Sequence, residues 1–223
     1  MQNQCNKLNK TFARRIGKSL SDTNKDILAN QLPSYLYSPE KLATSEYKKI
    51  FLEVGFGMGE HFFNQINLNP DSLYVGVEVY LNGVAKILKQ LKNTGHSNFM
   101  IWPDDLDLIL ENLPKKSLDG IYVLFPDPWH KRKYLKKRLF NQNRLNSFKD
   151  KLKSGGFVSF ASDIEDYFKS ACTMFDKDSD FTTQKSTDYF SPHSGYIQTK
   201  YHDKAIKEGR HAQFITAVFR KLF

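Results

Sequence analysis

The chain has 223 residues, enough for one domain with a sizeable core, and carries a formal net charge of +9. It has no apolar run long enough to span a bilayer, we expect no secretory signal, and its two cysteines give neither a disulfide framework nor a zinc-binding spacing. These features favour a cytoplasmic protein with a phosphate-rich partner and without membrane association, although simple solubility is an alternative explanation of the charge.

Residues 1–49 are polar and basic, and we expect a basic N-terminal arm with one short helix. Residues 50–223 form the second predicted unit, in which short apolar runs alternate with stretches of helical spacing. The predicted strands cover residues 50–55, 73–79, 98–102, 120–125, 157–162 and 214–219. The predicted helices cover residues 60–66, 81–92, 106–113, 137–152 and 164–175. This alternation predicts an α/β fold with a parallel sheet, helices on both faces and ligands beyond the carboxyl ends of the strands.

A glycine-rich loop follows the first predicted strand, where the backbone can approach a ligand closely. Its glycines, Gly55, Gly57 and Gly59, have the spacing G-x-G-x-G, and Glu60 stands where the dinucleotide fingerprint requires a third glycine. Glu53 at the mouth of the loop would repel a pyrophosphate but suits a cationic sulfonium ligand. A tight strand-to-helix turn without a ligand is the structural alternative.

Acidic residues follow the next two predicted strands. Glu78 ends the second strand, where a carboxylate can bind ribose hydroxyls, although it could also be a solvated carboxylate at a strand end. Asp104 and Asp105 follow the third strand and either meet an adenine edge or cap the next helix. In this order, the loop and the two acidic positions indicate a binding site for a nucleoside cofactor.

The fourth predicted strand leads into the sequence FPDPWHKRKYLKKR, residues 125–138. The flanking prolines fix Asp127 beyond the sheet edge and beside Trp129, and a carboxylate next to an aromatic ring suits a flipped nucleobase. A dense basic run follows and indicates a phosphate-binding patch rather than a solvated helix face. Its basic residues are Lys131, Arg132, Lys133, Lys136, Lys137 and Arg138.

These motifs resemble those of the bacterial tRNA (guanine-N7-)-methyltransferases, over about residues 12–219. The most specific match is FPDPW with the basic run that follows it. The glycine loop and the segment at residues 76–79 match in content and order. The sequence FASD at residues 160–163 resembles the family's FATD, and RRIGK at residues 14–18 resembles its basic arm.

The resemblance implies the class I methyltransferase fold, a Rossmann-like, mostly parallel seven-stranded sheet that ends in an antiparallel hairpin. It also implies methyl transfer from S-adenosyl-L-methionine to N7 of guanine in tRNA, at the variable-loop guanine. The implied cofactor contacts are Glu53, Glu78 and Asp104, together with Gly55, Gly57 and Gly59, and Asp127 is implied at the reaction centre. The implied tRNA contacts are Lys131, Asp163, Thr199, Lys200 and Tyr201. Position 202 departs from the family, because His202 replaces the usual glutamate.

The expected chemistry needs neither a metal nor a general base. N7 of guanine has a lone pair and no proton, so it can attack a sulfonium methyl group directly, and we expect Asp127 to stabilise the positive charge that develops. No ligand cluster predicts a metal, and no obligate protein partner is evident.

Two other functions compete with this interpretation. The glycine spacing and the basic run argue against a nicotinamide-dependent oxidoreductase. The intact Glu53, glycine loop and Asp127 argue against an RNA-binding protein with a decayed cofactor site.

Overall fold

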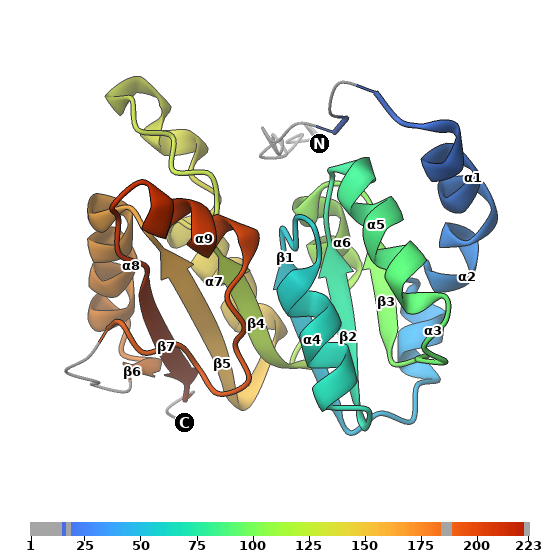
Figure 1. Ribbon diagram of the computed structural model, residues 1–223. Coiled ribbons are helices and arrows are strands. Elements are labelled where there is room, and N and C mark those ends of the chain that lie inside the picture. Colours follow the sequence, from blue (N-terminus) through green and yellow to red (C-terminus); the bar gives the residue numbers. More distant parts are fainter. Residues whose placement is uncertain (1–14, 17–18, 184–188, 221–223) are drawn as a thin grey trace, which may run out of the picture.

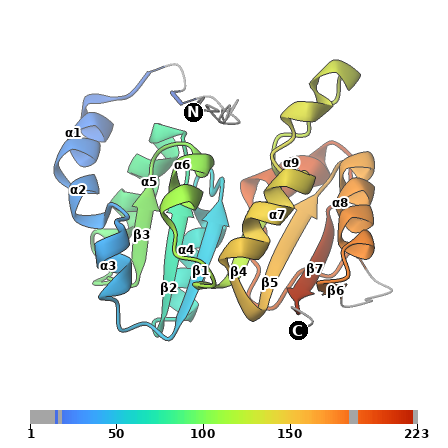
Figure 2. The same cartoon turned by 180° about the vertical axis from the view of Figure 1, so that it is seen from behind.

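One twisted sheet forms the centre of the computed structural model, which describes residues 15–16, 19–183 and 189–220, and helices cover both of its faces (Figures 1 and 2). The strand order is β3-β2-β1-β4-β5-β7-β6. The first five strands in this order, β3, β2, β1, β4 and β5, pair in parallel with their neighbours. Strand β7 is antiparallel to both β5 and β6. The strands are β1 (Lys49–Val54), β2 (Ser72–Val77), β3 (Phe99–Trp102), β4 (Leu118–Leu124), β5 (Leu152–Ser162), β6 (Phe181–Thr183) and β7 (Gln213–Phe219).

The predicted α/β fold is confirmed, and so is the expected mostly parallel sheet of seven strands with an antiparallel end. The chain runs from β1 outward to β3 and then returns to place β4 on the other side of β1. Because the strand order reverses between β1 and β4, a crevice for a ligand is expected at their carboxyl ends.

Two apolar clusters fill the two layers between the sheet and its helices. Side chains of α6, α7 and α8 belong to one cluster, and side chains of α1, α4 and α5 belong to the other. The helices α4, α5 and α8 each bury an apolar stripe, as α5 does with Val84, Ile87, Leu88 and Leu91. The helices of this domain are α4 (Glu60–Leu68), α5 (Leu81–Leu91), α6 (Leu106–Asn112), α7 (Gln142–Lys151), α8 (Glu165–Lys177) and α9 (Lys200–Lys207).

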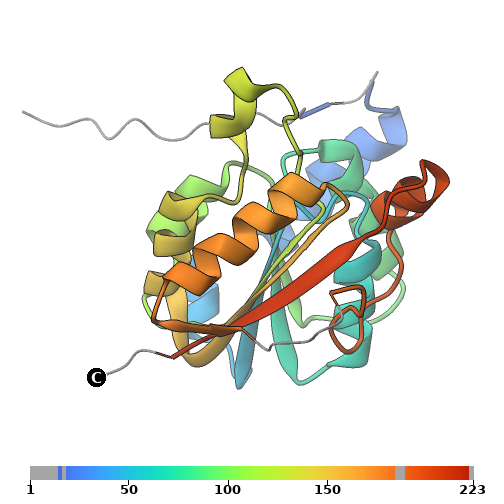
Figure 3. The ribbon, with the colours of Figure 1, turned by 90° about the vertical axis from the view of Figure 1, so that its left-hand side faces the viewer.

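The helix predicted for residues 137–152 begins later than expected. A short 3₁₀ helix, η1 (Arg132–Lys137), precedes it, and α7 begins only after Asn141, whose side chain accepts a hydrogen bond from the Arg144 N–H at 3.1 Å. Figure 3 shows the η1 segment projecting beyond the carboxyl edge of the sheet. The sequence also did not predict β6 or α9.

The N-terminal region contains more structure than the single helix that we expected. Its described part forms three helices, α1 (Asp22–Asn30), α2 (Leu32–Tyr35) and α3 (Pro39–Ala43). Leu36 forms a parallel bridge with Ile101, and the Tyr35 ring stacks on Phe99 with 4.5 Å between centroids, so this region packs against the edge strand β3. The expected basic arm extends beyond the described residues, where Arg14, Gly17 and Lys18 lie, and its boundary at residue 49 stays a prediction.

Candidate active site

Four neighbouring strands bring the predicted site residues to one edge of the sheet. Val54 is paired with both Val77 and Val123, and Val77 is paired with Trp102, so β1 to β4 end in register. The segments that follow these strands carry the glycine loop, Glu78, Asp104 and Asp127. The sequence-based expectation that these motifs share one edge is therefore confirmed.

The glycine loop has a backbone conformation that favours glycine. The φ angles of Gly55, Gly57 and Gly59 are 71°, 59° and 82°, all in the left-handed region. The Gly57 N–H donates to one oxygen of Glu78 at 2.6 Å, and the Tyr80 N–H donates to the other at 2.8 Å. Burial raises the pKa of Glu78, while these backbone hydrogen bonds oppose the rise. Glu78 thus fixes the loop, and each oxygen can accept a further hydrogen bond from a ligand.

Gly83, which the sequence did not single out, packs directly on this loop. A Cβ atom at Gly83 would lie 1.9 Å from the Gly57 carbonyl oxygen, a distance that no side chain tolerates. Glycine inside a helix costs roughly 1 kcal/mol of stability relative to alanine. A glycine in the first turn of a predicted helix could therefore have indicated, from the sequence, that another backbone segment packs closely there. Gly83 lets α5 support the loop at backbone contact.

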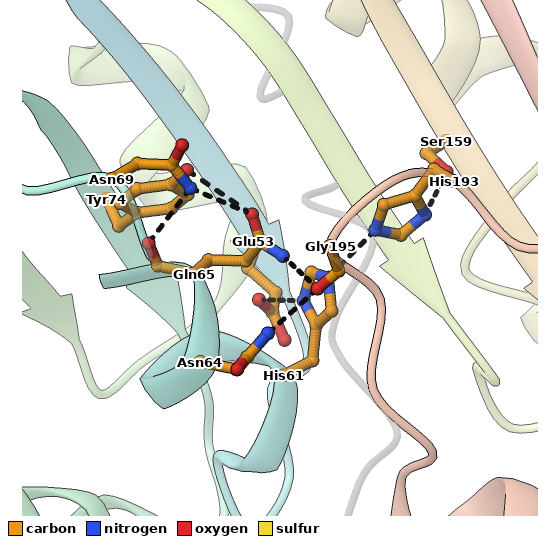
Figure 4. Close-up of polar contacts among 9 residues, drawn as sticks. All are labelled: Glu53, His61, Asn64, Gln65, Asn69, Tyr74, Ser159, His193 and Gly195. Atoms are coloured by element: carbon orange, nitrogen blue, oxygen red, sulfur yellow. Dashed lines mark hydrogen bonds and ion pairs between the residues drawn. The ribbon is translucent and has the colours of Figure 1, made fainter. Parts of the chain in front are cut away.

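Glu53, an expected cofactor contact, is buried and accepts a hydrogen bond from His61 Nδ1 at 2.7 Å. Nε2 of His61 lies 2.9 Å from Nε2 of His193, and Nδ1 of His193 lies 3.2 Å from the Ser159 hydroxyl (Figure 4). The sequence did not predict that either histidine belongs near the site. Contact between Glu53 and a cofactor stays a prediction.

The two aspartates after β3 have different partners. Asp105 is the N-cap of α6, because its carboxylate accepts from the Asp107 N–H at 2.9 Å. Asp104 instead accepts from the Arg15 guanidinium at 2.8 Å, and both of these side chains are partly exposed. Asp105 is thus a helix cap. Asp104 instead presents a carboxylate near the strand ends, paired with Arg15 of the N-terminal arm.

Two strained residues flank the Pro-Asp-Pro segment. Phe125 and Trp129 have φ angles of 52° and 43°, which are uncommon for residues with a Cβ atom. Asp127 between them is exposed, and the negative charge of Asp127 contributes to the raised pKa of Glu78. The segment lines a hollow of about 440 Å³, formed by Asp127, Pro128, Trp129, His130, Lys131 and Tyr134. A carboxylate and aromatic rings therefore line this hollow.

The basic run divides into exposed and anchoring residues. Lys131, Arg132, Lys133 and Lys136 are exposed, while the Lys137 ammonium lies about 5 Å from the centres of the Trp129 and Tyr134 rings. Lys131 immediately precedes the projecting η1 segment, and the other four side chains belong to it. They are placed where a polyanion could reach them.

Arg138, the last residue of the basic run, has partners within the protein. Its guanidinium is buried, donates to the Pro128 carbonyl at 2.9 Å and to Asp166 at 2.7 Å, and lies over the Tyr167 ring at 4.4 Å. These contacts tie the Pro-Asp-Pro segment to α8. In this structure Arg138 therefore holds the segment against α8, because its guanidinium is buried and bound to both Pro128 and Asp166; a contact from Arg138 to phosphate stays a prediction.

The start of α9 lies against the glycine loop. The buried Thr199 caps α9 by accepting from the His202 N–H at 3.3 Å, and Lys200 and Tyr201 are exposed on the first turn. A Cβ atom at Gly57 would lie only 3.0 Å from Cε2 of Tyr201. Burial and then the charges of Glu78 and Asp127 raise the pKa of Tyr201. Tyr201, expected to contact tRNA, thus lies against the glycine loop, near enough to Glu78 and Asp127 for their charges to act on it.

His202 and Asp163, the other expected tRNA contacts, have local partners. His202 is half-buried among the rings of Phe125, Tyr196 and Phe214, and its Nδ1 lies 3.0 Å from the Tyr196 hydroxyl. Burial lowers the pKa of His202. Asp163 accepts a hydrogen bond from the Arg210 guanidinium at 2.7 Å. Contacts from these residues to tRNA stay predictions.

The described part of the chain has neither a cluster of metal-binding side chains nor a membrane-spanning helix. Within residues 15–16, 19–183 and 189–220, no group of three or more histidine, cysteine, aspartate or glutamate side chains could hold a metal ion. None of the helices in the same ranges is both long and apolar enough to cross a membrane.

Residues 47–215 match the protein family described as "Putative methyltransferase". The chain is 56% identical over 208 residues to a "Bifunctional methyltransferase" of Rickettsia typhi, covering 93% of this chain but only 40% of that protein. It is also 35% identical over 221 residues to a "tRNA (guanine-N(7)-)-methyltransferase" of Rhizobium johnstonii, covering 95% of this chain and 94% of that protein. The chain thus spans about two fifths of its Rickettsia relative and nearly all of its Rhizobium relative.

Solved structures show the same fold at low sequence identity. The 16S rRNA methyltransferase KamB is 16% identical with a TM-score of 0.59, and the match covers 81% of this chain and 92% of that chain. The aminoglycoside resistance methyltransferase NpmB1 is 15% identical with a TM-score of 0.56, and the match covers 83% and 95%.

Proposed function

The chain belongs to the tRNA (guanine-N7-)-methyltransferase family, and we propose that it transfers a methyl group from S-adenosyl-L-methionine to N7 of a guanine in tRNA. The observation that carries the proposal is the position of Asp127. Its carboxylate lies between two prolines at the edge of the sheet that also bears the glycine loop and Glu78, with the basic η1 segment beside it. The guanine of the variable loop and a cytoplasmic location are the finer parts of the proposal.

The residues on the cofactor side fit a nucleoside with a cationic sulfonium group. The glycine loop offers backbone without side chains, Glu78 can accept hydrogen bonds from ribose hydroxyls, and Asp104 can accept from an adenine edge. Glu53 and Glu78 place negative charge near the loop, which suits a positively charged ligand and opposes a pyrophosphate. When bound, S-adenosyl-L-methionine supplies an electrophilic methyl group whose departure leaves a neutral thioether.

Guanine N7 needs no base to react. Its lone pair forms the new N–C bond while the methyl carbon–sulfur bond breaks, and the purine ring acquires the positive charge. The backbone that carries Asp127 is held by the two flanking prolines and by Arg138, which donates to the Pro128 carbonyl. A preorganised negative charge next to the developing positive charge lowers the barrier, and this effect is strongest where water is excluded.

The tRNA side of the site combines charge with aromatic rings. Lys131, Arg132, Lys133 and Lys136 are exposed and suited to phosphates, and Trp129 and Tyr134 provide faces on which a base can stack. Tyr201 continues this surface toward the glycine loop. These residues would hold a flipped guanine between the phosphate contacts and the methyl donor.

Transfer of a labelled methyl group tests the proposal. The chain is incubated with S-adenosyl-L-methionine labelled in its methyl group and with bulk tRNA, and the product nucleoside is identified and mapped. We expect 7-methylguanosine at one tRNA position, and binding of S-adenosyl-L-methionine but not NADH by calorimetry. Labelling of another base or atom, or tight binding of NADH alone, would contradict the proposal.

A further inference from the structure

A buried row of polar side chains connects the first strand with the segment that leads to α9. Glu53 on β1 contacts His61 on α4, His61 contacts His193, and His193 contacts Ser159 on β5, at 2.7, 2.9 and 3.2 Å (Figure 4). His61 and His193 are separated by 132 positions in the sequence. The two imidazoles therefore join the glycine-loop half of the chain to its C-terminal half.

The same helix holds the segment at a second point. The Gly195 carbonyl accepts hydrogen bonds from the side-chain amides of Asn64 and Gln65, both at 2.8 Å (Figure 4). One residue further on, the Tyr196 hydroxyl meets His202 in α9. Since α4 begins immediately after Gly59, the helix that ends the glycine loop also holds the segment that places Tyr201 over that loop.

The contact between the two imidazoles is a hydrogen bond with a single shared hydrogen. The Glu53 carboxylate only accepts, so Nδ1 of His61 carries a hydrogen, and one of the two facing Nε2 atoms must carry the other. Two nitrogens on one tetrahedral zinc, each about 2.0 Å from the metal, would lie farther apart than 2.9 Å. Burial and the neighbouring His61 lower the pKa of His193 to about 3, so His193 is neutral.

Other titratable groups face this contact from the surrounding elements. Tyr122 on β4 lies 5.0 Å, between ring centroids, from each imidazole, and Tyr196 lies 5.6 Å from His193 and 6.0 Å from His61. Burial raises the pKa of both tyrosines, so their hydroxyls stay protonated. Glu53 is the carboxyl group that faces the two imidazoles, and it is placed to accept a hydrogen bond from His61.

We propose that His61 and His193 are positioning residues whose shared hydrogen bond keeps residues 193–202 on α4 and thereby holds Tyr201 against the glycine loop. The expected effect on the rate of methyl transfer rests on the proposed function. The hydrogen bond and its effect on the mobility of residues 193–202 do not. Positioning of this kind acts on the rate of methyl transfer rather than on tRNA affinity, which phosphate contacts dominate.

Two conservative substitutions separate the two hydrogen bonds of His193. His193→Gln places an amide near the position of Nε2 and can still reach His61, whereas His193→Asn places one near Nδ1 and can reach only Ser159. Hydrogen exchange of amides 193–202 and single-turnover methyl transfer are measured for both full-length variants. We expect His193→Gln to stay within about twofold of wild type, and His193→Asn to show faster exchange and a rate lower by about tenfold, with tRNA affinity unchanged.

A third variant tests whether the effect passes through Tyr201. Tyr201→Leu removes the ring, so adding His193→Asn to it should lower the rate by less than twofold, a non-additive result. Equal exchange in the Asn and Gln variants would overturn the proposed hydrogen bond, and additive rate losses would overturn its action through Tyr201. If the wild-type chain does not methylate tRNA, the proposed function fails, and the exchange comparison still decides whether the hydrogen bond holds the segment.

Discussion

The cofactor side and the tRNA side of the site are built from different parts of the chain. On the cofactor side, backbone groups of the glycine loop bind the buried Glu78, and Gly83 packs without any side chain. On the tRNA side, Asp127 lines a hollow with Lys131 and Tyr134, and the exposed cations of η1 lie beside it. In the proposed function, the first arrangement would recognise a ligand by close approach of backbone, and the second by charge and aromatic faces.

This difference has a physical consequence for substitutions. Where α5 meets the loop at Gly83 there is no spare volume, so adding one methyl group there displaces the loop or the helix. A surface of separate exposed cations loses affinity in small steps, because each phosphate contact contributes independently. Substitutions on the two sides should therefore differ in size and in the ligand that they affect.

Gly83→Ala should have the largest effect, and it should lower the affinity for the cofactor without changing that for tRNA. The new Cβ atom would lie 1.9 Å from the Gly57 carbonyl, so the loop or α5 must move. We expect the affinity for S-adenosyl-L-methionine, measured by calorimetry, to fall by at least about 100-fold, or roughly 3 kcal/mol. Gly95→Ala is the control: its φ of 72° makes the substitution destabilising, but its Cβ atom meets open space away from the loop, so cofactor affinity should not change. Unchanged affinity in the Gly83 variant would show that the loop is not held by this contact.

Asp127→Asn tests the electrostatic part of the tRNA side. The amide keeps the shape of the side chain but removes its charge, so the single-turnover rate should fall by about 100-fold. Affinity for tRNA should change far less. Asp71→Asn removes an exposed carboxylate before β2, at the opposite edge of the sheet, and should leave the rate unchanged. A rate within a few-fold of wild type would leave positioning, rather than charge, as the source of catalysis.

The combination of Arg132→Ala with Lys136→Ala should lower tRNA affinity by about tenfold. Each lost phosphate contact should reduce the slope of log affinity against log salt by roughly one unit, without changing S-adenosyl-L-methionine affinity. The matched control is Lys48→Ala with Lys115→Ala, which removes the same charge from exposed positions before β1 and β4. If both pairs change the slope equally, the basic run has no specific role.

His202→Gln should have the smallest effect, visible only in acid. Because burial lowers the pKa of His202 in the folded state, the fold favours the neutral imidazole. That contribution to stability is complete above about pH 6.5, the pKa of an unperturbed histidine, and is lost as the pH falls toward the folded-state value. The Tm of the glutamine variant should therefore fall less than that of the wild type between pH 7 and pH 5. If Tm falls equally in the two proteins between pH 7 and pH 5, His202 does not contribute to the loss of stability in acid.

On both sides, the sequence predicted the local features of the site better than the contacts between distant segments. The glycine loop, Glu78 and the Pro-Asp-Pro segment were predictable, because each follows a strongly apolar strand and depends on neighbouring residues. The pairing of His61 with His193 depends on contacts between distant segments, and so does the burial of Arg138 by Asp166. Local patterns do not encode which distant partner a polar side chain meets.

The helices showed the same distinction. Long amphipathic helices such as α5 were predicted within a few residues of their bounds. The short helices α2 and α3 have too few residues to show a period, and the sequence analysis did not predict α9.

Replacement of the acceptor atom tests the central claim most directly. A tRNA carrying 7-deazaguanosine at the labelled position has a C–H group in place of N7 and otherwise keeps the shape of the base. If the chain methylates N7, this tRNA should bind as tightly as the unmodified one and accept no labelled methyl group, while 7-deazaguanosine at another guanine should leave transfer intact. Methyl transfer to the substituted position at the normal rate would contradict the assignment of N7 as the acceptor.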